Sequence, residues 1–155
     1  MADYPLIFTL THEIRCPKFS ARIVSRGRAL MVLEDGEWWC HGVEPGGLTE
    51  HGEQPAHAFA GFKGALGEIF QDLAGDAASL EAFARAVREF ISEGDSTEAV
   101  RWEAARLQVR SSGKDVAAPF DQLPREVREI RASVRVEKLE HIEAAEELVA
   151  LAEAA

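Results

Sequence analysis

Hydrophobic and polar residues alternate strictly near the start of the chain. Apolar side chains at positions 6, 8, 10 and 14 fall on one face, and Thr9, Thr11 and Glu13 fall on the other. A period of two residues is typical of a half-buried strand. The alternation returns over positions 19–23, and the Arg-Gly pair at positions 26–27 is expected to form a turn.

A hairpin is predicted after this turn. Positions 30–33 are apolar on both faces, as expected of a central strand. Asp35 and Gly36 follow, and this pair favours a two-residue turn because both of its positions need a positive φ. Positions 38–43 then form the returning strand, so the chain up to position 50 is expected to be an antiparallel meander.

The period becomes helical after Pro55. Apolar residues recur at helical spacing over positions 55–74, with Pro55 in the first turn. Gly61, Gly64 and Gly67 lie within this helix, where each glycine costs up to about 1 kcal/mol relative to alanine. Either a neighbouring backbone or ring approaches the helix closely at these glycines, or the helix is flexible.

Two more helices, a strand and a final helix are predicted beyond it. Ser79 is expected to cap the second helix, and positions 95–98 are typical of a capping sequence for the third. Alternation over positions 129–137 predicts a late strand, and an amphipathic helix is predicted from Ile142. The apolar residues of the third helix are Val100, Trp102, Leu107 and Val109.

These elements predict an α+β fold. The small, mostly antiparallel sheet would consist of the meander and the late strand, with helices packed on one face. A chain of 155 residues is long enough for one domain with its own core. We expect a single α+β domain over positions 1–137 and an acidic C-terminal helix or tail over positions 138–155.

Charge narrows the range of partners. The formal net charge is −10 at pH 7, and the last 19 residues carry −5 of it, with six carboxylates against one lysine. Such a charge opposes a phosphate backbone, so direct binding to nucleic acid is not expected. The acidic end either solubilises the chain or docks a basic protein, and Glu140, Glu143 and Glu147 are the candidates for that contact.

Membrane and disulfide signals are missing from the sequence. No apolar run approaches the roughly 18 residues of a membrane span, and Cys16 and Cys40 are too few for a disulfide framework. A cytoplasmic location is the expectation. Cys40 and His41 stand next to each other, but strand alternation places their side chains on opposite faces. The sequence also has no HExxH or CxxC spacing, so we expect no catalytic residue, metal or cofactor.

The adjacent tryptophans Trp38 and Trp39 suggest an interface. Alternation points one indole to each face of the sheet, so one should lie in the core and the other should be covered or exposed. Exposed aromatic side chains are favoured anchors of protein interfaces. Together with nearby polar groups they give the candidate partner-binding residues of this region, which are Trp38, Trp39, His41, Glu44, Thr49 and Glu50.

A block over positions 28–62 resembles HicB-type antitoxins. The strand containing Trp39 runs into the sequence GVEPGGLTEHG at positions 42–52, and a helix follows. The family typically has a strand, a Pro-Gly-Cys turn, an extended Thr-x-Gly piece and a helix that begins Glu-Glu-Ala. The matching residues here are Pro45, Gly46, Thr49, Gly52 and Ala58. A glycine replaces the cysteine of the family, and two further helices precede the late strand.

The resemblance implies a partial RNase H-like sheet that lacks the RNase H catalytic carboxylates and serves as a binding module. In the family, this module binds a small basic mRNA interferase and covers its active site, and a separate tail binds DNA. We expect no such tail here. We expect a non-catalytic protein-binding module with a basic partner, and a homodimer formed through a sheet edge or the tryptophan face. The alternative is a small-ligand-binding protein or an enzyme with a pocket between the sheet and the helix at positions 55–74.

Overall fold

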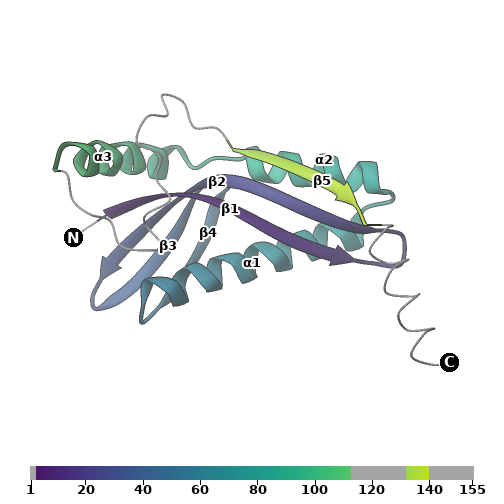
Figure 1. Cartoon of the computed structure of the whole chain (residues 1–155), viewed down its shortest axis with the longest axis horizontal. Helices are drawn as coiled ribbons and strands as arrows, with labels where there is room; N and C mark the ends of the chain where they lie inside the picture. The colour runs from purple at the N-terminus through teal and green to yellow at the C-terminus, as the bar shows by residue number, and fades with distance from the viewer. Residues whose placement is uncertain (1–2, 113–131, 140–155) are drawn as a thin grey trace.

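The structure, a computed structural model, describes residues 3–112 and 132–139. The first four strands are consecutive antiparallel neighbours: β1 (Asp3–Arg15), β2 (Ser20–Glu34), β3 (Glu37–Glu44) and β4 (Gly46–Gly52). The helices follow as α1 (Pro55–Asp76), α2 (Leu80–Ser92) and α3 (Ser96–Ser112), and β5 (Ser133–Lys138) returns to pair with β2. The α+β class, the meander and the late strand are therefore confirmed (Figure 1).

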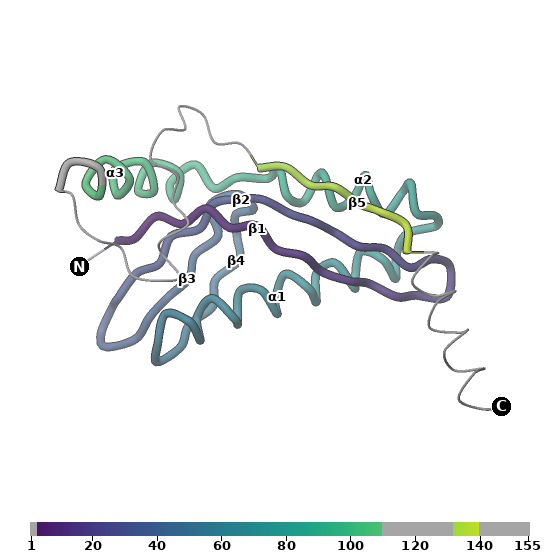
Figure 2. The backbone as a smooth tube through the Cα atoms, viewed as in Figure 1, coloured from purple at the N-terminus to yellow at the C-terminus, as the bar shows by residue number. Residues whose placement is uncertain are grey.

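β2 is the centre of the sheet. One of its edges pairs with β1 in an unbroken register from Arg15↔Ser20 to Asp3↔Val32. The other edge is shared end to end, because β5 pairs with the first half of β2 and β3 pairs with the second half. Figure 2 shows β2 as one long strand across the molecule.

The prediction of a turn at positions 26–27 is wrong, because Gly27 lies inside β2 and pairs with Phe8. A Cβ atom on Gly27 would lie 2.1 Å from the carbonyl oxygen of Glu44 and 2.7 Å from Cζ of Phe8. Glycine is needed here for close packing in mid-strand, where a residue without a side chain commonly marks such an approach.

Both faces of the sheet are buried by helices. The larger core joins one face to α1 and α2 and includes Phe8, Met31, Phe62 and Phe83. The smaller core lies on the opposite face, where Ile7, Leu30, Val32 and Val43 pack against Trp102 and Ala105 of α3. The expectation of helices on one face thus holds for α1 and α2, while α3 covers the other face (Figure 1). The reason is that β2 is apolar at consecutive positions from 29 to 32, so both of its faces need cover there.

The predicted turn and caps are confirmed. Asp35 and Gly36 have φ angles of 52° and 79°, as the tight hairpin requires. The Ser79 hydroxyl accepts a hydrogen bond from the Ala82 amide at 3.1 Å, and Oδ1 of Asp95 accepts one from the Glu98 amide at 3.0 Å. The predicted final helix, with Glu140, Glu143 and Glu147, lies outside the described residues, as does most of the 138–155 segment.

Candidate protein-binding surface

A row of aromatic and polar side chains lies on the sheet face that α3 shares. Glu37, Trp39 and His41 alternate along β3 and therefore point to the same face. Across the strand pair, β4 places His51 opposite Trp39 and Thr49 opposite His41. We call these residues, Glu37, Trp39, His41, Thr49 and His51, the Trp39 surface. Trp39 is half-buried at the border of the core under α3, so the surface has a fixed base.

Contacts between neighbouring side chains of β3 and β4 fix the orientation of the rings of the Trp39 surface. The ring centroids of Trp39 and His51 are 4.7 Å apart, and those of Trp39 and His41 are 6.3 Å apart with their planes only 7° from parallel. His41 Nδ1 lies 3.1 Å from the Thr49 hydroxyl, and His51 Nδ1 lies 3.7 Å from the Glu37 carboxylate. The result is an ordered aromatic surface with a carboxylate at one end.

The hairpin between β2 and β3 adds negative charge beside this surface. Glu34 pairs directly with Glu37 across the strands, so the two exposed carboxylates lie on one face. Asp35 in the turn is exposed as well. Like charges in directly opposed positions weaken a strand pair by roughly 0.2–1 kcal/mol. Of the two glutamates, Glu37 lies near His51 of β4, as described above.

The candidate partner-binding residues predicted from sequence do not all lie together in the structure. Trp39, His41 and Thr49 come together, as described above. Trp38 points to the opposite face, as predicted for one of the two indoles, and its ring centroid lies 5.8 Å from that of Tyr4. Glu50 is on that opposite face too, beside Gly61 of α1.

Glu44 has a structural role. Its Oε1 accepts a hydrogen bond from the backbone amide of Ala132 at 2.9 Å and lies 3.6 Å from the guanidinium of Arg28. The side chain thereby ties the end of β3 to the residue that precedes β5. Both contacts are made within the chain, so the Glu44 carboxylate serves the fold at the end of β3.

Sequence reasoning missed Glu37 and His51. β4 continues to Gly52 and carries His51 opposite Trp39. β4 contains a single large apolar residue, Leu48, so it has almost no alternation from which a strand could be predicted. The useful signal is the short connection after β3, since an antiparallel return over positions 46–52 brings position 51 across from position 39.

Cys40 is placed for packing and not for chemistry. As predicted, it faces away from His41, and its side chain is completely buried in the larger core. Burial raises the pKa of the Cys40 thiol to about 12, and the negative charge of Glu50 contributes to the rise. The thiol is therefore protonated at neutral pH and is a poor nucleophile or metal ligand. Residues 3–112 and 132–139 contain no group of three or more metal-binding side chains.

The pocket considered between the sheet and α1 would need Trp38 or Trp39 and His41 beside the helix glycines. Trp39 and His41 face away from α1, so this lining is divided between two faces of the sheet. A Cβ atom on Gly67 would lie 3.1 Å from the His12 ring, and one on Gly61 would lie 3.4 Å from Glu50. Of the two alternatives for the helix glycines, a close neighbour is found at Gly67, whereas Gly61 makes an ordinary contact and Gly64 has no atom within 4 Å of such a Cβ.

Within the described residues, no helix is both long and apolar enough to span a bilayer. No protein-family model, no curated protein and no solved structure matches this chain.

Proposed function

We propose that this chain is a non-catalytic protein-binding module, HicB-like in its core, that binds a small basic protein in the cytoplasm. The observation that carries the proposal is the Trp39 surface, an aromatic centre bordered by the opposed carboxylates Glu34 and Glu37. Aromatic side chains within a polar rim are typical of binding surfaces. A formal net charge of −10 favours encounter with a basic partner.

The order of elements supports the HicB-like part of the proposal. The block that resembles HicB-type antitoxins has the order strand–strand–strand–helix. The structure has this order in β2, β3, β4 and α1, and β5 returns to the same sheet. In this interpretation β1, α2 and α3 are additions to the core. The partner would then be a toxin nuclease of the mRNA interferase kind, whose positive surface fits the acidic hairpin.

The binding role without catalysis is supported by the placement of the reactive groups. Cys40 is buried, and the adjacent His41 points to the other face of the sheet, where its ring nitrogen lies next to the Thr49 hydroxyl. A nucleophile and its base must lie within hydrogen-bonding reach of each other, and this pair does not. His41 is therefore assigned to contact with the partner.

Co-expression with the products of the adjacent genes tests the function. The tagged chain should retain a basic neighbour at low salt and release it at high salt, because opposite charges between surfaces are screened by ions. Trp39→Ala should weaken retention at least tenfold, as expected for a central aromatic anchor, whereas Trp38→Phe, on the opposite face, should not. Failure to retain any neighbour at low salt would contradict the proposal, as would a salt-sensitive gel shift with nucleic acid.

We also propose that the chain forms a homodimer through the outer edge of β1. That strand pairs with β2 on one side only, and none of the other described strands lies on its second side. An unpaired edge of this length is a template for a further strand. The Trp39 surface lies on β3 and β4, away from the β1 edge, and would remain available to the basic partner.

A further inference from the structure

We infer that the Trp39 surface binds an arginine side chain of the basic partner. Its guanidinium would lie against the Trp39 indole and donate hydrogen bonds to Glu37. The inference rests on the proposed function and states the chemistry by which the partner is recognised.

The spacing of the two residues matches the shape of a guanidinium. Glu37 and Trp39 are two positions apart on one face of β3, so their Cα atoms lie about 7 Å apart along the strand and their side chains are neighbours on that face. A guanidinium is planar, stacks on aromatic rings and can bond a carboxylate through its edge at the same time. A lysine ammonium is a compact point charge, so it matches only one of the two contacts at a time.

The same face of the sheet already holds one arginine in this way. The Arg28 guanidinium lies 5.2 Å from the ring centroid of Trp102 and 3.6 Å from the Glu44 carboxylate. Trp39 and Glu37 repeat the pairing of an indole with a carboxylate further along the sheet. Among the described residues, the groups that Glu37 and Trp39 contact at the Trp39 surface are imidazoles, so the guanidinium inferred at this place would come from the partner.

Negative charge at the end of the β2–β3 hairpin also favours an arginine at this place. Glu34 and Glu37 oppose each other on this face, an arrangement that weakens the hairpin in isolation. A guanidinium between them would turn the repulsion into attraction, since it carries five N–H donors and can serve two carboxylates. The parallel rings of Trp39 and His41 would then border the bound side chain.

The chain contains its own reporters for a direct test. Its three tryptophans occupy distinct places, with Trp39 on the surface, Trp38 on the opposite face and Trp102 buried with its indole N–H bonded to the Leu6 carbonyl. Their indole N–H signals can be followed by nuclear magnetic resonance during titration with a short arginine-rich peptide. A lysine-rich peptide of equal length and charge is the matched probe. Both titrations are made at the same pH and salt concentration.

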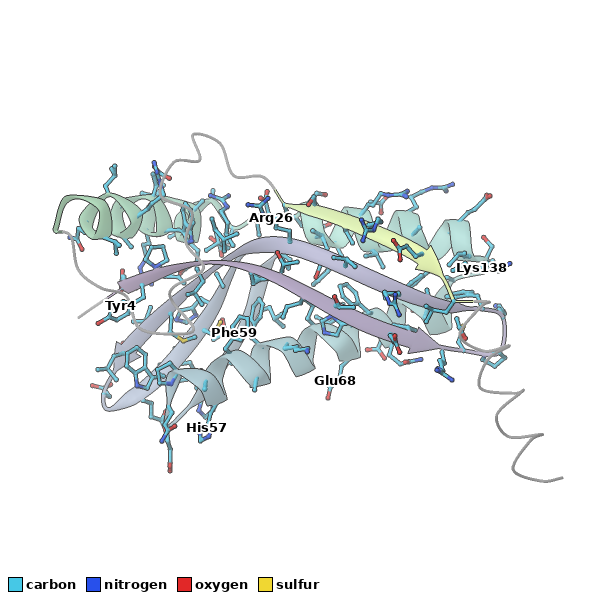
Figure 3. The ribbon with its side chains drawn as sticks, viewed as in Figure 1. Tyr4, Arg26, His57, Phe59, Glu68 and Lys138 are labelled. Atoms are coloured by element: carbon cyan, nitrogen blue, oxygen red, sulfur yellow. The ribbon has the colours of Figure 1, made fainter. Side chains whose placement is uncertain are left out.

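We expect the arginine peptide to shift the Trp39 signal while Trp38 and Trp102 stay in place. The lysine peptide should bind at least about threefold more weakly, because it loses the stacked, bidentate geometry. Glu37→Gln should weaken binding of the arginine peptide about tenfold, as the loss of a charge-assisted hydrogen bond predicts. Glu68→Gln makes the same change of charge on α1, where the side chain projects away from the sheet (Figure 3), and should alter binding by less than about twofold.

Several results would overturn the inference. These are equal binding of both peptides, equal effects of Glu37→Gln and Glu68→Gln, or a shift confined to Trp38. The position of the buried Trp102 signal reports on folding in every variant, so a loss of binding through unfolding is recognised. A co-expressed neighbour that still binds tightly to Glu37→Gln would contradict the arginine contact and leave the proposed function standing. If no neighbour binds but the Trp39 signal still responds to arginine, the proposed function fails and the site remains.

Discussion

Gly64 and Gly67 lie one turn apart on α1 and meet different surroundings. A Cβ atom on Gly67 would approach the His12 ring to 3.1 Å, whereas one on Gly64 would have no atom within 4 Å. Gly64→Ala should therefore raise the free energy of unfolding by up to about 1 kcal/mol through helix propensity alone. Gly67→Ala should gain less or destabilise, because the histidine ring must move. Urea unfolding of both variants measures the difference, and an equal gain at the two positions would contradict the close packing of His12.

His12 is a half-buried polar residue whose ring lies next to Gly67. Its Nε2 lies 2.9 Å from the carbonyl oxygen of Lys63, so this nitrogen carries the hydrogen and donates. The ring packs edge-on against Phe70 with centroids 5.2 Å apart, and Nδ1 is buried without a hydrogen-bond partner. Burial lowers the pKa of His12 from its ordinary value of 6.5, and the positive charge of Lys63 adds to this, although the hydrogen bond to the Lys63 carbonyl acts in the opposite direction.

This lowered pKa predicts a loss of stability in acid. As the pH falls below about 6.5, the unfolded chain binds a proton at His12 and the folded chain does not, so the free energy of unfolding decreases. The decrease ends when the pH passes the lowered pKa of the folded state. His12→Gln keeps a donor for the Lys63 carbonyl but cannot titrate, so its stability should depend less on pH than that of the parent chain. Thermal unfolding between pH 8 and pH 5 tests this, with the exposed His57→Gln as the control that should follow the parent.

At the scale of elements, α3 depends on one side chain. Trp102 is buried under the sheet, its indole N–H donates to the Leu6 carbonyl at 3.0 Å, and Arg28 lies over its ring. The other large apolar residues near it, Val100 and Leu107, are 72% and 54% exposed. α3 is thus attached to the second face of the sheet mainly through Trp102.

Trp102→Ala should consequently lower the free energy of unfolding by about 3–5 kcal/mol, the usual range for removing a large buried aromatic side chain. Leu107→Ala truncates an exposed residue of the same helix and should change it by less than about 0.5 kcal/mol. Chemical denaturation followed by far-ultraviolet circular dichroism gives both values. Similar values for the two variants would mean that α3 is held by contacts other than the Trp102 ring.

The elements that could be predicted from sequence are those with local signals. The Asp35–Gly36 turn, the Ser79 cap and the alternation in β1 each act within a few residues, and each appears as expected. Gly27 was misread because a glycine required by a long-range contact looks the same in sequence as a glycine in a turn. Its partner Phe8 is 19 positions away, and only the sheet brings the two together.

At the scale of the whole molecule, long-range contacts also decide which parts of the candidate site could be predicted from sequence. Alternation along β3 correctly gave Trp38 and Trp39 to opposite faces, but it could not say how far the Trp39 indole would be covered. That depends on α3, which covers Val43 and leaves the stretch from Glu37 to His41 at its margin. His51 and the opposition of Glu34 to Glu37 follow from strand register, which a single sequence with one weak strand does not fix.

The last prediction concerns the outer edge of β1. β1 is 13 residues long and pairs with β2 without a register shift, and in residues 3–112 and 132–139 no strand pairs with its outer edge. The Cys16 amide donates to the Phe19 carbonyl, so even-numbered residues of β1 face β2 with their main-chain groups and odd-numbered residues face outward. The bond from the Gln71 side chain to the outward carbonyl of Arg15 agrees with this assignment. Two copies of such an edge can pair antiparallel about a twofold axis, each supplying the donors and acceptors that the other needs.

We therefore expect sedimentation of the full chain to show a dimer that dissociates on dilution. Thr11→Pro removes an outward N–H and leaves the bonds to β2 intact, so it should raise the dissociation constant at least about tenfold. Thr11→Val keeps the N–H and the branched side chain, and should leave the dimer unchanged. A parent chain that stays monomeric at all concentrations would refute edge pairing. A dimer that tolerates Thr11→Pro but is lost with Trp39→Ala would instead place the twofold contact on the Trp39 surface, where it would compete with the basic partner.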